Sequence, residues 1–257
     1  MISKAQINFI KTLQQRKVRQ KESLFLVEGA KMLDELLTSD FEIDQLILTE
    51  NAAEHYSILY PNVFKKIATE IVNENQLSTL SSLQNVSFGL AVVKIKNQIL
   101  NPSILFEQAK ESLILVLDQI QDPGNLGTII RLADWFGITQ IVGSSNTVDC
   151  FNTKTIQATM GSVFRTPVFY ANLEELFNNN LEPISVFGAT LNGTSIYNHP
   201  LSSAGFIVLG NESKGISPEV LKFVTQQIKI PSFGKAESLN VAIATGIICS
   251  EFKSRLH

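Results

Sequence analysis

Three segments, each directly after a predicted strand, concentrate residues that could hold a ligand or assist a reaction. Residues 118–131 have the sequence DQIQDPGNLGTIIR, residues 210–215 are GNESKG, and residues 231–242 are PSFGKAESLNVA. Glycine and asparagine in such turns bring backbone N–H and C=O groups close to a ligand without a metal. Because open parallel sheets bind ligands beyond the carboxyl ends of their strands, we expect these loops to form one site.

Arg131 is the side chain in these loops best suited to an anion. The chain has five arginines, and only Arg131 and Arg165 lie between residues 20 and 254. A guanidinium flanked by apolar residues, as Arg131 is, needs a carboxylate or a phosphate to offset its desolvation. One interpretation is a buried pair with Glu212 or Asp134, and the other is a contact to a phosphate or a ribose.

Helix capping is the structural alternative for two of the loops. Asn125 could cap a helix that begins near Leu126, and Ser238 precedes a long C-terminal helix in the same way. Either motif alone is explained by capping. The functional interpretation therefore depends on the loops being taken together.

Several enzyme classes are disfavoured by motifs that the chain lacks. There is no GxGxxG, the Gly234-Lys235 pair lacks the rest of a phosphate-binding P-loop, and no GxSxG is present. Dehydrogenase, kinase and serine hydrolase activities are thus poor hypotheses. Two cysteines, Cys150 and Cys249, and three histidines support neither a disulfide framework nor a zinc site, so we expect two buried thiols and no metal.

The C-terminal part of the chain alternates short apolar runs with helix-length segments. Runs that are apolar on both faces indicate parallel strands covered on both sides, which predicts a Rossmann-like α/β domain. The predicted strands are residues 113–117, 140–142, 166–170, 184–188, 205–210 and 227–230.

The N-terminal part predicts a smaller α/β unit. The expected elements are a short helix within 7–13, a strand at 24–27, a helix at 29–37, a strand at 45–48, a helix at 75–83 and a strand at 87–93. A polar stretch at 94–103 then breaks the periodicity. We therefore predict a domain over residues 1–95, a linker over 96–108 and a second domain over 109–257.

Charge is distributed unevenly in this chain of 257 residues, which has a net charge of −3. Residues 1–31 hold seven basic and two acidic residues, whereas the remainder holds 14 basic and 22 acidic. A basic head on an acidic body suits a polyanion bound at one end, although a solvated helix face is equally compatible. The longest aliphatic run, 113–117, is too short to span a bilayer, and no secretory signal is evident, so we expect a cytoplasmic protein without membrane association.

Together the three loops resemble the motifs of the SpoU (TrmH) branch of the SPOUT-class RNA methyltransferases. Residues 118–131 resemble the first motif, 208–215 the second and 230–242, with Ser-Leu-Asn at 238–240, the third. Residues 1–93 resemble the family's ribosomal-protein-like substrate-binding domain, which opens with a basic helix and a Phe-x-Val-Glu-Gly segment, here residues 25–29.

The resemblance implies transfer of a methyl group from S-adenosylmethionine to a ribose 2'-hydroxyl of RNA, a C-terminal trefoil knot and a homodimer. The implied catalytic residues are Arg131, Asn125, Glu212, Ser238 and Asn240. The implied cofactor-binding residues are Thr190, Leu209, Gly210, Asn211, Ile230, Ser238 and Leu239. The expected RNA-binding residues are Lys11, Arg16, Lys17, Arg19, Lys21 and Arg165.

Roles follow from the chemistry of the implied reaction. Arginine stays protonated in proteins, so we expect Arg131 to fix the ribose and its phosphate and to stabilise negative charge that develops on oxygen. Asn125 and Asn240 would orient Arg131, and Glu212 would hold Arg131 or the loop. Ser238 would contact substrate or cofactor.

Ribosomal RNA is favoured over transfer RNA because a separate N-terminal domain is predicted. The alternatives are a transfer RNA ribose methyltransferase, a non-catalytic RNA-binding protein on the same scaffold, and methylation of a base nitrogen by a related knotted enzyme.

Overall fold

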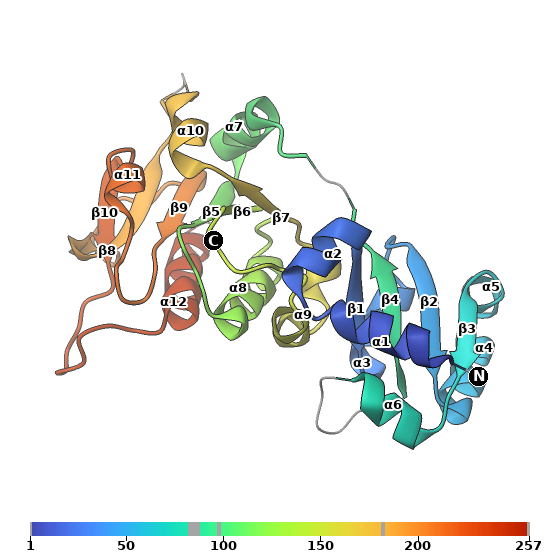
Figure 1. The fold of residues 1–257 in the computed structure, drawn as a ribbon. Helices are drawn as coiled ribbons and strands as arrows, with labels where there is room; N and C mark the ends of the chain where they lie inside the picture. Colours follow the sequence, from blue (N-terminus) through green and yellow to red (C-terminus); the bar gives the residue numbers. More distant parts are fainter. Residues whose placement is uncertain (1, 82–87, 97–98, 181–182, 256–257) are drawn as a thin grey trace. The chain divides into compact units, whose positions relative to one another are not determined.

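The chain forms two compact units in a computed structural model that describes residues 2–81, 88–96, 99–180 and 183–255. The first unit comprises Met1–Asn97 together with Phe151–Phe164, and the second comprises Gln98–Cys150 and Arg165–His257. Figure 1 shows both units, each built on its own sheet.

The first unit is a small mixed α/β domain, as predicted. Its sheet has the order β1-β4-β2-β3, in which β4 pairs antiparallel with β1 and β2, and β2 pairs parallel with β3. The strands are β1 (Leu24–Glu28), β2 (Ile43–Leu48), β3 (Ala68–Ile71) and β4 (Gly89–Lys94). The helices are α1 (Lys4–Thr12), α2 (Arg16–Glu22), α3 (Ala30–Leu37), α4 (Glu50–Leu59), α5 (Pro61–Phe64), α6 (Glu74–Leu80) and α9 (Thr153–Thr159).

Apolar residues on both faces of this sheet pack against helices. Leu33 of α3 and Leu46 of β2 belong to one buried cluster, and Ile10 of α1 and Leu77 of α6 belong to the other. The sequence did not predict β3, because it is a short edge strand with no fully buried residue.

A segment far along the chain completes the first unit. Ile156 of α9 and Phe164, the last residue of a short 3-10 helix (Ser162–Phe164), lie in the cluster that contains Leu33. The Gln157 side chain donates a hydrogen bond of 2.7 Å from Nε2 to the carbonyl oxygen of Glu28. Sequence periodicity gave no reason to join this segment to the N-terminal sheet.

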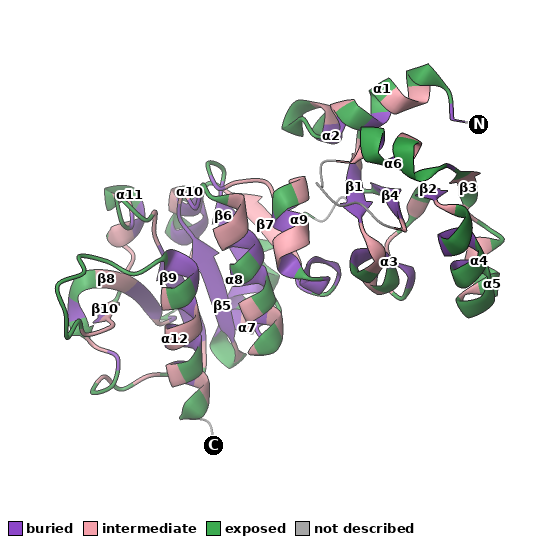
Figure 2. Cartoon of the chain, turned by 90° about the horizontal axis from the view of Figure 1, so that it is seen from below, coloured by how far each residue is buried: buried purple, intermediate pink, exposed green. Residues whose placement is uncertain are grey.

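The second unit confirms the predicted parallel sheet. Its six strands have the order β10-β8-β9-β5-β6-β7, and every neighbouring pair is parallel. The strands are β5 (Leu113–Leu117), β6 (Ile141–Ser144), β7 (Val168–Ala171), β8 (Val186–Ser195), β9 (Gly205–Leu209) and β10 (Gln226–Lys229). Every residue of β5 and β9 is buried, and Figure 2 shows these central strands as buried.

Helices flank the strands of the second unit. They are α7 (Pro102–Glu111), α8 (Pro123–Trp135), α10 (Leu173–Asn178), α11 (Pro218–Leu221) and α12 (Val241–Ser254). α8 and α12 pack against each other, with Leu132 of α8 beside Gly246 of α12. The loops after β5, β9 and β10, where the motifs lie, therefore belong to one body.

Some predicted boundaries differ from the observed ones. β7 and β8 each begin two residues later than predicted, and β8 continues to Ser195. The predicted linker 96–108 contains the start of α7, where the Asn101 side chain caps the helix by accepting from the amides of Ser103 and Ile104. Residues 82 and 83 of the predicted helix and residue 87 of the predicted strand lie outside the described ranges.

Candidate active site

The first motif loop enters α8 through Asp122, not through Asn125. The Asp122 carboxylate accepts a hydrogen bond of 2.8 Å from the amide of Asn125, and Pro123 occupies the first helical position. Proline suits that position because its φ angle is already helical and its missing N–H would have no helical partner. The prediction that Asn125 caps this helix was wrong, and its side chain is free for other contacts.

The third motif loop enters α12 through Asn240, so the prediction that Ser238 caps this helix was also wrong. The Asn240 Oδ1 accepts hydrogen bonds from the amides of Ala242 (2.9 Å) and Ile243 (3.3 Å). These bonds satisfy N-terminal amides of α12 that have no partner within the helix. The cap also fixes the direction in which the Asn240 Nδ2 points.

Asn240, Asn125 and Glu212 connect the three motifs, and we call their hydrogen bonds the interloop network. Asn240 Nδ2 donates to Asn125 Oδ1 at 2.8 Å, and Asn125 Nδ2 donates to Glu212 Oε1 at 2.7 Å. The carboxylate can only accept, so the Asn125 amide must turn its nitrogen toward Glu212 and its oxygen toward Asn240. Each amide orientation is therefore determined by its neighbour.

The second motif loop is held from the first one by two further contacts. The buried Asp118 accepts a hydrogen bond of 2.7 Å at Oδ2 from the amide of Ser217, and Asn211 Nδ2 donates to the carbonyl oxygen of Gln119 at 2.9 Å. Gly210 is required sterically, since a Cβ there would lie 2.2 Å from the carbonyl carbon of Gly215. Hydrogen bonds and close packing thus fix the shape of the loop.

A pocket of about 580 Å³ is lined by the second and third motif loops and by residues of β8, whereas the first motif loop, residues 118–131, is not part of its lining. All seven residues predicted to bind the cofactor line it: Thr190, Leu209, Gly210, Asn211, Ile230, Ser238 and Leu239. Its walls also include the buried apolar residues Ile216, Ile228 and Ile248, and Glu212 lies at the same pocket. The pocket combines an apolar interior with exposed backbone in glycine-containing loops, which is typical of small-molecule sites.

Arg131 does not belong to the interloop network. It is exposed on α8, is not among the residues lining the pocket, and makes no hydrogen bond or ion pair with the part of the chain that the structure describes. Glu212 binds Asn125, and Asp134 forms an ion pair with Arg165 at 2.9 Å. The interpretation of Arg131 as a buried ion-pair partner was therefore wrong.

Comparison with known proteins assigns the chain to a family. The model of the SpoU rRNA Methylase family matches residues 112–250, and that of the MRM3-like substrate binding domain matches residues 4–90. The chain belongs to the SpoU rRNA methylase family. This membership confirms the resemblance drawn from the three loops and from residues 25–29.

Relatives within the family cover nearly the whole chain. The 23S rRNA (guanosine(2553)-2'-O)-methyltransferase RlmP of Bacillus subtilis is 30% identical over 240 residues, which are 93% of this chain and 92% of the relative. A protein from Porphyromonas gingivalis assigned to the TrmH family of RNA methyltransferases is 33% identical, with a TM-score of 0.83 and 99% of both chains covered. An rRNA methyltransferase from Sinorhizobium meliloti, solved with AdoMet bound, is 28% identical, with a TM-score of 0.83 over 100% of this chain and 98% of that chain.

The basic residues of the N-terminal unit fall into two groups. Lys11, Arg16, Lys17 and Lys21 are exposed on α1 and α2. Arg19 is only 1% exposed, and its guanidinium donates to the backbone carbonyl oxygens at positions 13 and 14, at 2.9 and 2.8 Å. Its position is that of an internal structural residue, which was not foreseen because lysines and arginines alternate along the helix.

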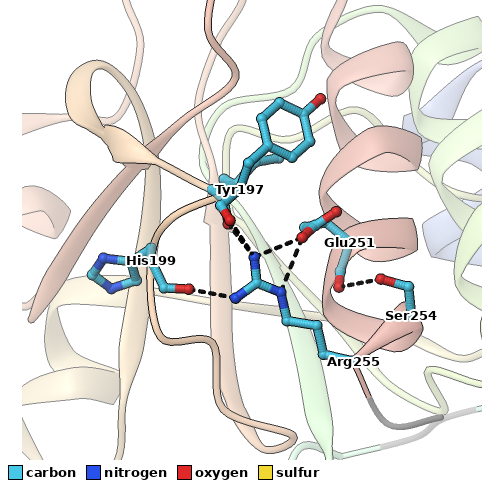
Figure 3. Close-up of polar contacts among 6 residues, drawn as sticks. Tyr197, His199, Glu251, Ser254 and Arg255 are labelled. Atoms are coloured by element: carbon cyan, nitrogen blue, oxygen red, sulfur yellow. Dashed lines mark hydrogen bonds and ion pairs between the residues drawn. The ribbon is translucent and has the colours of Figure 1, made fainter.

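Arg255 is a structural residue of the second unit that sequence reasoning missed. Figure 3 shows its guanidinium between the end of α12 and the loop after β8. It donates to the carbonyl oxygens of Ile196 (2.8 Å), Tyr197 (3.0 Å) and His199 (2.6 Å), and it binds Glu251 at 2.6 Å. β8 and α12 both line the pocket, so Arg255 joins two of its walls. No motif surrounds Arg255, and only its place near a helix C-terminus is suggestive.

Both cysteines are buried, as predicted. Burial raises the pKa of the Cys249 thiol to about 12, which keeps it protonated and unreactive at neutral pH.

No helix in the described ranges is long and apolar enough to cross a membrane. Among the same residues, no three His, Cys, Asp or Glu side chains gather as ligands of a metal ion would.

Proposed function

We propose that this chain is an S-adenosylmethionine-dependent methyltransferase that modifies a ribose 2'-hydroxyl of ribosomal RNA. One observation carries the proposal: the second and third family motifs line one pocket, and the interloop network joins the first motif to both of them. Membership of the SpoU rRNA methylase family and the 2'-O activity named for the Bacillus subtilis relative support the same reaction.

The residues of the pocket fit the cofactor. A volume of about 580 Å³ lies within the range of small-molecule sites, and apolar walls suit an adenine ring. At Gly210 two backbone segments approach so closely that no side chain fits, which leaves main-chain groups to face a ligand. We assign cofactor binding to Thr190, Leu209, Gly210, Asn211, Ile230, Ser238 and Leu239. The bound cofactor would supply a methyl group already activated by its sulfonium.

Arg131 provides the positive charge for the RNA side of the reaction. Its exposed guanidinium has no partner within the described ranges, so it is available to a substrate phosphate without first breaking an ion pair. Arginine remains protonated, so Arg131 would hold the ribose and its phosphate and stabilise negative charge on the attacking oxygen. The interloop network would keep Asn125 and Glu212 in place at the cofactor pocket while the RNA enters.

RNA recognition is assigned mainly to the first unit and methyl transfer to the second. The exposed side chains of Lys11, Arg16, Lys17 and Lys21 form the proposed phosphate-binding surface, and Arg19 is left out because it is buried. Arg165 is exposed but paired with Asp134, so an RNA phosphate would have to compete with that carboxylate. Ribosomal RNA is the favoured substrate because the SpoU rRNA Methylase family model and the activity named for the Bacillus subtilis relative both refer to it.

A homodimer formed through α8 and α12 is part of the proposal. These helices pack together and expose large apolar side chains, with Trp135 83% and Ile243 58% exposed. A second copy of this chain would bury both residues, and sedimentation of the protein and of Trp135→Glu would test the assignment. The trefoil knot and the cytoplasmic location remain predictions.

Transfer of labelled methyl from S-adenosylmethionine to total RNA tests the function. Nuclease digestion and mass spectrometry of the product should place the label on a ribose, and mapping should place it in ribosomal RNA. Label on a base nitrogen would indicate a base methyltransferase, and label in transfer RNA would indicate a transfer RNA methyltransferase. Either result would overturn the proposal. Calorimetry without added metal should show cofactor binding, and the absence of binding would contradict the enzyme hypothesis.

A further inference from the structure

Some of the large apolar side chains that line the pocket are exposed to solvent. Phe233 is 95% exposed, Leu191 is 72% exposed and Leu239 is 47% exposed, and all three line the pocket. Single exposed apolar residues are ordinary on protein surfaces, but a group of them around one ligand opening marks a binding surface. We call these three residues the apolar rim.

Phe233 lies in a loop that presents its ring openly. The loop joins β10 to α12, and Ser232 Oγ donates to the carbonyl oxygen of Gly234 at 3.3 Å. A Cβ placed on Gly234 would meet no atom within 4 Å beyond its chain neighbours, so the loop is open at the residue that follows Phe233. With 95% of its surface exposed, the Phe233 side chain is accessible to a ligand from solvent.

Lysines accompany the apolar rim. Lys214 lines the pocket, and Lys235 follows Phe233 by two residues. Both are exposed, and neither forms an ion pair within the described part of the chain. Glu237 also lines the pocket, so the rim is mixed in charge rather than uniformly basic. An exposed aromatic ring with cations nearby matches a base and its flanking phosphates.

The geometry points to Phe233 as the residue that stacks on a base of the RNA substrate, with Lys235 and Lys214 meeting the adjacent phosphates. This inference rests on the proposed function and deepens it. A base inside a duplex has both faces covered by its neighbours, so only an unpaired base can lie on the ring. The substrate class is therefore a nucleotide in a single-stranded or loop segment.

The test uses the full-length protein, S-adenosylmethionine and an RNA fragment that carries the mapped target nucleotide. Phe233→Ala should raise the KM for this RNA roughly tenfold, and Phe233→Trp should restore it, because loss of a stacked aromatic weakens single-strand binding by about that much. Ile104→Ala, which removes a 54% exposed side chain outside the pocket, is the matched control and should change nothing.

An abasic target nucleotide supplies the second arm. It should raise the KM of the wild-type protein for RNA about as much as Phe233→Ala does. The two changes together should raise this KM no more than either change alone. Pairing the target in a duplex should likewise abolish the difference between the wild-type protein and Phe233→Ala.

Several results would overturn the inference. An unchanged KM for RNA in Phe233→Ala would remove the stacking role. Weaker cofactor binding by calorimetry would make the cofactor's adenine the partner of the ring, and a changed sedimentation coefficient would make it a second copy of this chain. Normal transfer to RNA in these cases leaves the proposed function intact, whereas a wild-type protein that methylates no RNA defeats both.

Discussion

Asn240 and Phe233 lie seven residues apart in the same motif, but one side chain is held by hydrogen bonds and the other is exposed to solvent. The Asn240 side chain makes three hydrogen bonds, accepting from two amides of α12 and donating to Asn125. Phe233 leaves 95% of its surface in solvent. Contacts within the protein thus fix the side chains of the interloop network, whereas Phe233 of the apolar rim remains exposed to solvent.

The difference separates two tasks that the site must perform. Residues whose partners are other protein groups fix the pocket before any ligand arrives, which avoids reorganisation during the reaction. Phe233 and Arg131, whose side chains have no hydrogen-bond or ion-pair partner among the described residues, are left available for RNA. Substitutions in the interloop network should therefore lower both stability and turnover. Substitutions of Phe233 and Arg131 should leave stability unchanged and alter only RNA binding or the rate of methyl transfer.

Loss of Arg131 should give the largest effect. Arg131→Ala is expected to lower kcat by about 100-fold or more, because a positioned donor to a developing oxyanion contributes that much in other enzymes. The melting temperature and cofactor affinity should not change, since Arg131 is exposed. Single-turnover transfer of labelled methyl measures the rate, and retained turnover would remove Arg131 from its role.

Asn125→Asp should reduce turnover roughly tenfold and make stability depend on pH. The new carboxyl would face Glu212 Oε1, now 2.7 Å from Asn125 Nδ2, and two carboxylates that close need a shared proton. One of the two titration steps of the pair would have a folded-state pKa raised above the unfolded value. The stability present at low pH would therefore be lost as pH rises through the raised pKa. Thermal melts across the pH range check this, with the wild-type protein as control.

Asn240→Ala should cost about 0.5–2 kcal/mol of stability, the usual loss for a helix cap, and should weaken turnover because Asn125 loses a partner. Ser238→Ala is the matched control: it lies in the same loop but does not cap α12, so its melting temperature should equal that of the wild-type protein. Equal melting temperatures for Asn240→Ala and the wild-type protein would show that the cap contributes nothing.

Lys235→Gln should give the smallest effect. A single exposed lysine that meets a phosphate should change the KM for RNA only a few-fold and lower the magnitude of the salt dependence by about one counterion. The kcat should be unchanged. Binding measured at several salt concentrations checks the slope, and an unaltered slope would show that Lys235 does not reach a phosphate.

The sequence predicted the fold class well and the details of the loops less well. Apolar runs such as 113–117, alternating with helix-length segments, indicate strands of a sheet covered on both faces, and this pattern predicted the parallel architecture. The predicted helix caps were wrong, although the sequence contained the right signal. Asp122 directly before Pro123 is a stronger helix N-cap signal than Asn125. Asn240, immediately before the buried Val241, was passed over for Ser238 in the same way.

The sequence by itself determined which residues could do chemistry, the order of the three motifs and the family to which they belong. The tertiary structure decided which distant residues contact one another. Asn240 binds Asn125 across 115 positions of the chain, and residues 151–164 complete the N-terminal unit. It also decided that Arg19 is buried. The physical reason is that side-chain preferences act over a few residues. Contacts between distant loops depend on strand order and register, which a single sequence does not specify.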